Sequence, residues 1–277
     1  MTLPTFVGIG VPRGGTTWLH TLLAGHPDVY MPTRRKEIRF FDRHYEQGFG
    51  WYESFFCPPE ERGRYRAIGE ISPQYLYCTA CPERIARSLP QARLVVTLRH
   101  PVARAYSQYG FVVQRRNYRG SFEDFVAARP SALEKGFYSG HIRNYLQFFE
   151  RSQLLPLVFE EVFADPPAAR QRVADFLGVT TDGFDATAGG KKVNASTIPR
   201  FGRGSRVAIT VGRRLRRWKL EPLVDLGRRA GVQQVITRGK APPALAEETK
   251  YELSERYAEE FEELERCLEI DLSCWRT

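Results

Sequence analysis

The sequence has few of the residues on which small secreted domains and metal-binding domains depend. Only five of its 277 residues are cysteine, an odd number that is scattered along the chain. Such a set does not make a disulfide framework. Cys78 and Cys81 form a C-x-x-C, but no second pair or neighbouring histidine completes a zinc site. We interpret this pair as plain thiols, with a local disulfide or a redox role as the alternatives.

The chain also lacks a long apolar run. No segment approaches the roughly 20 apolar residues that a membrane-spanning helix requires. The first residues have neither the basic region, the apolar helix nor the small-residue cleavage site of a signal peptide. We therefore expect no membrane span and a cytoplasmic location.

Acidic residues are the minority among the charged ones. The chain has 32 Asp or Glu against 41 Lys or Arg, which gives a formal net charge of +9. This excess favours anionic ligands, a polyanion or a membrane surface, without choosing among them. Residues 200–240 alone hold twelve basic and two acidic residues. This segment is interpreted as an acceptor-site lid, a contact for an anionic partner or a solvated helix.

Residues 6–27 have the pattern of an anion-binding turn. Residues 6–11 form a short apolar run that is typical of a strand buried on both faces. A tight turn over residues 12–15 separates this run from a helix that begins at Thr16 and ends before Gly25. Unpaired amides at the start of such a helix, together with its dipole, converge on the turn. The segment therefore suits a phosphate group.

The turn differs from the Walker A loop, G-x-x-x-x-G-K-[ST]. Gly10 and Gly15 have the right spacing, and Thr17 takes the position of the magnesium-binding hydroxyl. Thr16, however, stands where the lysine would be, and the basic residue, Arg13, lies inside the loop. This pattern does not indicate a site for the β- and γ-phosphates of a nucleoside triphosphate with magnesium.

A second basic motif follows the clearest predicted strand of the chain, residues 92–98. This strand ends at Arg99, and a helix is predicted over residues 102–109. In P-loop triphosphatases the corresponding strand often ends in an aspartate that holds magnesium. A cation there reverses the local electrostatics and argues against a metal-dependent phosphoryl transferase.

Together the two motifs resemble those of sulfotransferases, which use 3′-phosphoadenosine-5′-phosphosulfate (PAPS). The sequence PRGGTTW is similar to their 5′-phosphosulfate loop, P-K-x-G-T-T-W, with an arginine in place of the lysine. A guanidinium keeps the charge, but it is a planar fork rather than a compact proton donor. LRHPxxRAYS resembles their 3′-phosphate motif, R-x-P-x-x-R-x-x-S. The resemblance implies these cofactor ligands: Pro12, Arg13, Gly14, Gly15, Thr16, Thr17, Trp18, Arg99 and Ser107.

Residues 36–42, KEIRFFD, provide a candidate general base. They resemble the K/N-E-x-H-F-F-D segment of heparan-modifying carbohydrate sulfotransferases, whose glutamate deprotonates the acceptor. Glu37 matches that glutamate, and Arg39 replaces the usual histidine. An alcohol needs such a base because it is a weak nucleophile near neutral pH. From the residues alone, a solvated loop is the alternative for this segment. The family's G-x-Y motif implies Tyr138 and His141 as further site candidates, with His141 as the alternative base.

Two other segments resemble the family less closely. The motif G-E-K-S/T-P-x-Y has Ile71 in place of its lysine, so only Ser72 and Tyr75 are kept as possible lining residues. A basic loop after residues 189–190 matches by position and charge. It adds these second-tier cofactor ligands: Lys191, Lys192 and Asn194.

We therefore predict one α/β domain over residues 1–277, with a P-loop-like core and a mostly parallel central sheet flanked by helices. Residues 1–199 would form the nucleotide-binding and catalytic core, residues 200–240 the basic segment, and residues 243–277 a C-terminal helix that packs on the core. The other predicted strands are 67–70 and 154–161; the other predicted helices are 82–89, 170–177 and 243–268.

The predicted reaction moves a sulfuryl group from PAPS to a hydroxyl, or less favourably an amine, of a carbohydrate or small natural-product acceptor. Glu37 would act as the base, Arg13 would stabilise the transferring group, and adenosine 3′,5′-bisphosphate would remain. No metal and no nucleic-acid partner is expected, and the resemblance suggests a soluble bacterial member. The alternatives are a P-loop nucleotide kinase and a non-enzymatic binder of anionic polymers.

Overall fold

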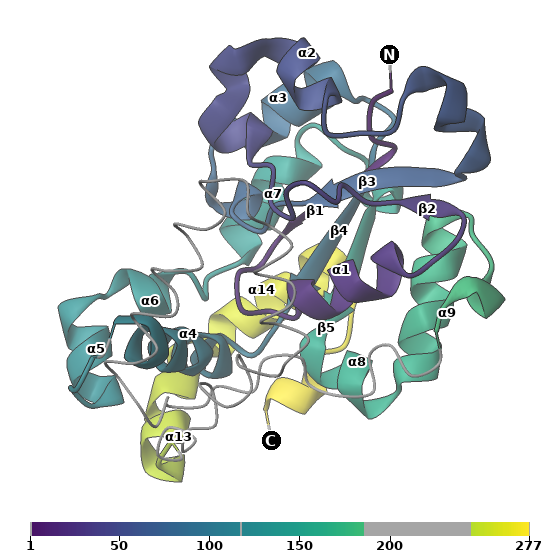
Figure 1. Cartoon of the computed structure of the whole chain (residues 1–277). Helices are drawn as coiled ribbons and strands as arrows, with labels where there is room; N and C mark the ends of the chain where they lie inside the picture. Colours follow the sequence, from purple (N-terminus) through teal and green to yellow (C-terminus); the bar gives the residue numbers. More distant parts are fainter. Residues whose placement is uncertain (1, 117, 186–244, 277) are drawn as a thin grey trace, which may run out of the picture. The chain divides into compact units, whose positions relative to one another are not determined.

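The computed structural model describes residues 2–116, 118–185 and 245–276 (Figure 1). They divide into two compact units. The first holds the described residues of 2–104, 133–185 and 252–276, and the second holds those of 105–132 and 245–251. The single domain predicted over residues 1–277 stays a prediction.

The first unit is built on a five-stranded sheet in which every pair of neighbouring strands is parallel. The strand order is β2-β3-β1-β4-β5. The strands are β1 (Phe6–Gly10), β2 (Val29–Tyr30), β3 (Ala67–Ile71), β4 (Arg93–Leu98) and β5 (Leu154–Val158). All residues of β1 and β3 are buried, which explains why β1 has a continuous rather than alternating apolar sequence; β3 also carries one buried acid, Glu70. The predicted α/β class with a mostly parallel sheet is confirmed.

Helices cover both faces of this sheet (Figure 1). Side chains of α1, α8 and α9 share one buried apolar cluster with β1 and β5, whereas α7 packs against α3 and α14. Right-handed crossovers account for this division, because the chain leaves β1 and β3 in opposite directions along the sheet. The helices of this unit are α1 (Thr16–Ala24), α2 (Gly48–Glu53), α3 (Cys81–Ser88), α7 (Ser139–Leu146), α8 (Phe159–Ala164), α9 (Pro166–Leu177) and α14 (Ala258–Leu268).

Short single turns join these elements. They are η1 (Phe40–His44), η2 (Tyr45–Gln47), η3 (Pro59–Arg64), η4 (Tyr75–Tyr77), η5 (Arg151–Gln153), η6 (Thr181–Gly183) and η7 (Ser273–Trp275). Helix α5 (Phe122–Ala128) belongs to the second unit. Three helices run from one unit into the other: α4 (Pro101–Arg116), α6 (Ser131–Glu134) and α13 (Glu247–Glu255). Among the helices that the structure describes, none has the length and apolar character needed to cross a membrane.

Two predictions differ from the observed elements in more than the exact bounds of a helix. The strand predicted over residues 154–161 ends at Val158, because its partner β4 ends at Leu98, directly opposite. Residues 159–161 instead begin α8. The single helix predicted over residues 243–268 is two helices, α13 and α14, separated at Tyr257. Burial of the Tyr257 ring, whose hydroxyl donates to the Leu133 carbonyl at 2.6 Å, favours the break.

The C-terminal segment is tied to the core by buried polar contacts. The Glu260 carboxylate of α14 accepts hydrogen bonds from the Ser139 amide at 2.6 Å and the Ser139 hydroxyl at 2.8 Å. The Trp275 indole donates to Glu160 at 2.9 Å. These contacts fix the start of α7, where the buried Tyr138 hydroxyl donates to the Arg99 carbonyl at 2.9 Å. The C-terminal segment thereby supports the segment that follows β4.

Candidate active site

The turn between β1 and α1 is closed by backbone hydrogen bonds and leaves no room for a side chain at Gly14. The Val11 amide donates to the Thr97 carbonyl of β4 at 2.7 Å, and the Gly14 amide donates to the Val11 carbonyl at 3.0 Å. A Cβ atom on Gly14 would lie 2.9 Å from the Thr97 carbonyl oxygen. Gly15 has φ of +102°, a conformation that favours glycine. The sequence Gly14-Gly15 is therefore required by the turn itself.

Helix α1 presents an uncapped N-terminus to this turn. Its N-cap residue is Gly15, which has no side chain to accept a hydrogen bond, and its first turn contains no acidic residue. The first amides of a helix have no intrahelical acceptor, and the helix dipole makes this end positive. Thr16 and Thr17, which begin the helix, are buried and half-buried. The turn and helix start together form a cradle that suits an anion.

Lys36 reaches this cradle from a distant part of the sequence. Its ammonium donates a hydrogen bond to the Thr17 hydroxyl at 2.8 Å. Burial lowers the Lys36 pKa; nearby Glu37 opposes this effect, and Arg13 adds to it. The pKa of His20 on α1 falls to about 4, first because of burial and then because of Lys36. His20 is therefore neutral near pH 7, and the cradle's cations are Arg13 and Lys36.

The backbone segment that follows Glu37 is held in place by hydrogen bonds to side chains on β3 and just after it. The Ile38 amide donates to the Glu70 carboxylate of β3. The Arg39 amide donates to the Ser72 hydroxyl at 2.9 Å, and the Phe41 amide donates to the Tyr75 hydroxyl at 3.3 Å. Three amides close in sequence to Glu37 are thus bound by one buried cluster.

Glu70 is the centre of that cluster, and its side chain is fully buried. Its carboxylate accepts hydrogen bonds from the hydroxyls of Tyr75 at 2.7 Å, Ser72 at 2.7 Å and Tyr52 at 3.1 Å. Burial raises the Glu70 pKa, and these hydrogen bonds oppose the rise because they favour the ionised form. A buried acid that is this well satisfied acts as a rigid anchor rather than as a reactive group.

Ser72 and Tyr75 therefore do not line a pocket. The prediction that they could do so is wrong, because both side chains have 0% exposure and belong to the Glu70 cluster.

Arg39 has a carboxylate partner of its own. Its guanidinium forms an ion pair with Asp42, three residues further along the chain. The arginine that replaces the family histidine is thus paired with a carboxylate other than Glu37.

Arg99 lies beside the cradle, at the carboxyl end of β4. Its Nη1 donates to the Arg13 carbonyl at 3.3 Å, and its guanidinium lies 4.4 Å from the centre of the Phe159 ring. Within the described part of the chain, its buried Nε has no hydrogen-bond partner. Burial lowers its pKa. β1 and β4 are adjacent strands whose connections leave in opposite directions, and such a switch point is where open parallel sheets bind ligands.

The other predicted site residues are placed less directly. Trp18 is 3% exposed and packs beside Phe163 in the core, which leaves little of its surface for stacking on a base. Tyr138 is fully buried, and His141 is half-buried against Tyr77. Ser107 is a half-buried residue of α4, in the second unit. The predicted ligands Lys191, Lys192 and Asn194, like the basic segment 200–240, lie outside the described residues.

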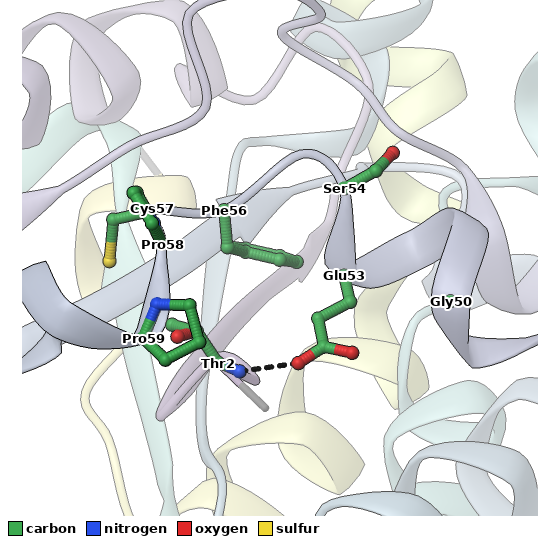
Figure 2. Close-up of a pocket in the computed structure, with 8 residues that line it drawn as sticks. All are labelled: Thr2, Gly50, Glu53, Ser54, Phe56, Cys57, Pro58 and Pro59. Atoms are coloured by element: carbon green, nitrogen blue, oxygen red, sulfur yellow. Dashed lines mark hydrogen bonds between the residues drawn. The ribbon is translucent and has the colours of Figure 1, made fainter.

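A pocket of about 570 Å³ lies elsewhere (Figure 2). It is lined by Thr2, Gly50, Glu53, Ser54, Phe56, Cys57, Pro58 and Pro59. Its one acidic side chain, Glu53, accepts a hydrogen bond from the Thr2 amide at 2.6 Å (Figure 2). None of these lining residues is a predicted site residue. Thr2 also precedes β1, whereas the cradle follows that strand. Across the described residues, no group of three or more His, Cys, Asp or Glu side chains is arranged to hold a metal ion.

Known proteins resemble this chain in sequence. The family model described as "Sulfotransferase domain" matches residues 4–192. A mouse heparan sulfate glucosamine 3-O-sulfotransferase 3B1 is 33% identical over 186 residues, which cover 64% of this chain and 46% of that protein. The human heparan sulfate glucosamine 3-O-sulfotransferase 6 is 34% identical over 214 residues, 71% of this chain and 61% of its own.

A solved structure shares the fold over the full length. The crystal structure of a sulfotransferase from Alicyclobacillus acidocaldarius superposes with a TM-score of 0.70 at 24% identity and covers 100% of both chains. The fold and site thus define a P-loop-like α/β protein with an anion cradle. The chain belongs to the sulfotransferase family, as the motifs predicted. It spans about half the length of the first curated relatives that it matches.

Replacing Glu70 tests whether the buried cluster holds the segment after Glu37. In Glu70→Gln an amide group takes the place of one acceptor oxygen, so at least one buried donor loses its partner. We expect the free energy of unfolding to fall by about 1–3 kcal/mol. Hydrogen exchange at the amides of residues 38, 39 and 41 should become faster than in the wild type under native conditions.

The exposed Glu46→Gln is the matched control and should leave both measurements unchanged. Unaltered exchange at these three amides in Glu70→Gln would show that the cluster does not position the segment.

Proposed function

We propose that this protein transfers a sulfuryl group from PAPS to a hydroxyl of an acceptor molecule. The observation that carries the proposal is the meeting of three cationic side chains around one helix N-terminus. Arg13 lies in the turn, Lys36 is bound to Thr17, and Arg99 contacts the backbone of Arg13. Glu37, a candidate base, directly follows Lys36 in the sequence.

The residues present suit the donor's anionic groups. The cradle has no room for side chains at Gly14, and the amides at the start of α1 are available to a 5′-phosphosulfate. Arg99, whose Nε has no partner among the described residues, would bind the 3′-phosphate, and guanidinium groups bind phosphates well through paired N–H donors. Ser107, Lys191, Lys192 and Asn194 are proposed as additional ligands of that phosphate, and Trp18 as a neighbour of the nucleotide.

The contact of Lys36 with Thr17 argues against a magnesium-dependent kinase. In a Walker loop the corresponding hydroxyl binds magnesium. Here that hydroxyl accepts a hydrogen bond from an ammonium group, which supplies positive charge at the same place. The strand end that would offer a carboxylate to the metal carries Arg99 instead.

Residues of this chain can then be assigned to proton removal and to charge stabilisation in the proposed reaction. When bound, the donor supplies the sulfuryl group that is transferred. Glu37 accepts the hydroxyl proton as the acceptor oxygen forms its bond to sulfur and the bond between sulfur and the phosphate oxygen breaks. Arg13, Lys36 and the cradle amides stabilise the negative charge that develops on the sulfuryl oxygens and on the departing 5′-phosphate. Lys36 supplies the compact ammonium that Arg13 does not.

The acceptor is proposed to be a carbohydrate hydroxyl. Two relatives named as heparan sulfate 3-O-sulfotransferases support this choice. A small natural product is the other acceptor class, and an amine is the less favoured group. A cytoplasmic location and the lack of a nucleic-acid partner stay predictions.

Replacing Glu37 tests the role of the base. Glu37→Gln keeps the size of the side chain but cannot take a proton, so we expect kcat to fall by about 10²–10⁴-fold. Affinity for adenosine 3′,5′-bisphosphate should not change, because Glu37 is not assigned to the nucleotide. Transfer of labelled sulfate from PAPS to a panel of sugars, with calorimetry of the bisphosphate, measures both quantities. A Glu37→Gln variant with wild-type kcat would exclude this residue as the base.

Replacing Lys36 tests the second cation of the cradle. Lys36→Met keeps the length of the side chain and removes its charge. We expect kcat to fall by about 10²–10³-fold, which is the usual effect of removing one donor that stabilises charge in the transition state. Lys36→Arg should recover part of the rate. Arg34→Met, which removes an exposed cation two residues earlier, is the control and should retain activity. Equal rates for Lys36→Met and Arg34→Met would contradict the assignment.

A further inference from the structure

Cys78 and Cys81 lie on one tight turn between η4 and α3. The Cys81 amide donates to the Cys78 carbonyl at 3.2 Å, a hydrogen bond between residues i and i+3. In such a turn the two Cα atoms are less than about 7 Å apart. Disulfides bridge Cα atoms separated by about 4.4–6.8 Å. The backbone therefore already brings the two cysteines within bonding range.

The two thiols of this turn face each other and differ in environment. The Cys81 thiol donates a hydrogen bond to the Cys78 sulfur. Cys78 is half-buried and can meet a small reagent, whereas Cys81 is fully buried as the first residue of α3. Cysteines in Cys-X-X-Cys motifs often have lowered pKa values, and here the first cysteine is the accessible one and the second is buried.

The charge on the pair is set by its surroundings. The hydrogen bond from Cys81 lowers the Cys78 pKa to about 7; burial opposes this, and the amides of Cys81 and Ala80 add to it. The same hydrogen bond and burial raise the pKa of Cys81 far above its ordinary value. Asp42 raises the pKa of both thiols, and Arg84 lowers that of Cys81. Cys78 therefore has more thiolate character near pH 7 than an ordinary cysteine, and Cys81 keeps its proton.

We propose that Cys78 and Cys81 form a redox-active dithiol, with Cys78 as the attacking thiolate and Cys81 as the resolving thiol. The oxidant is a low-molecular-weight disulfide such as glutathione disulfide. The Cys78 thiolate attacks one sulfur of the oxidant and forms a mixed disulfide with it. The S–S bond of the oxidant breaks, and its other sulfur leaves as a thiolate.

The buried Cys81 then completes the exchange. It gives up its proton and attacks the Cys78 sulfur, which displaces the second thiol of the oxidant. The two cysteines lose two electrons, and the oxidant is reduced to two thiols. This site is independent of the sulfuryl transfer proposed above, because neither cysteine belongs to the cradle or to the segment that carries Glu37.

The turn nevertheless borders the elements that hold that segment. The preceding element η4 carries Tyr75, which binds the Phe41 amide, and Arg84 of α3 donates to the Phe41 carbonyl at 2.7 Å. The Cys78–Cys81 turn therefore joins two elements that contact the same residue, one at its backbone amide and the other at its backbone carbonyl.

The chain contains its own control for reactivity. Cys274 is the most exposed cysteine, but partial desolvation of its thiol and the carboxylates of Glu160, Glu161 and Asp271 raise its pKa to about 11. If exposure decided reactivity, Cys274 would react first. If thiolate content decides it, Cys78 should react at least about tenfold faster near neutral pH, even after allowing for the lower nucleophilicity of a low-pKa thiolate.

The test uses the native full-length protein, treated with glutathione disulfide and then alkylated, with each cysteine quantified by peptide mass spectrometry. We expect Cys78 and Cys81 to be lost together as an intramolecular disulfide that dithiothreitol reverses. Cys81→Ser should trap glutathione on Cys78, Cys78→Ser should abolish the reaction at this turn, and Cys274→Ser should behave as the wild type. Circular dichroism confirms that each variant is folded.

Two results would overturn the proposal. One is native wild-type protein in which the pair stays reduced while Cys274 is glutathionylated. The other is a Cys78→Ser variant in which Cys81 reacts as fast as it does in the wild type.

Discussion

The arrangement of the site depends on one buried carboxylate. Glu70 lies on β3, beside the central strand, and receives hydrogen bonds from three hydroxyls and one backbone amide. An unsatisfied buried carboxylate would be costly, so the groups that surround it are effectively fixed once it is buried. Two of those hydroxyls also accept hydrogen bonds from the backbone: Ser72 accepts from the amide of residue 39, and Tyr75 accepts from the amide of residue 41. The sheet thus determines where the segment bearing Lys36 and Glu37 enters the site.

The parallel sheet explains why distant segments meet. β1 and β4 are neighbours, so the turn after one strand and Arg99 after the other emerge at the same edge. Arg13, Lys36 and Arg99 bring positive side-chain charge to the cradle, and its backbone contributes the positive end of a helix. In the proposed reaction, positive charge from Lys36 at Thr17 would take over the task that a divalent metal has in P-loop kinases. The same proposal directs this fold toward sulfuryl rather than magnesium-dependent phosphoryl chemistry.

Much of this could be predicted from the sequence. The buried strands have continuous apolar runs, and the Gly14-Gly15 turn reflects steric limits that any sequence with this turn must obey. The contact of Lys36 with Thr17 could not be predicted, because it joins residues 19 positions apart whose approach depends on η1 and the Glu70 cluster. Ser72 and Tyr75 were misplaced for a related reason: polar residues in a motif resemble a pocket lining until the buried acid that they satisfy is seen. The helix break at Tyr257 depends on its tertiary contact with Leu133.

The measurement that tests the central claim most directly is calorimetric titration with adenosine 3′,5′-bisphosphate and, separately, with ATP and magnesium. Wild-type protein should bind the bisphosphate tightly without magnesium, and Arg99→Ala should lose most of that affinity because it removes the proposed 3′-phosphate ligand. Binding of ATP with magnesium alone would contradict the account and favour a kinase. Binding of neither nucleotide would also contradict it and would turn attention to the basic segment 200–240 and to anionic polymers.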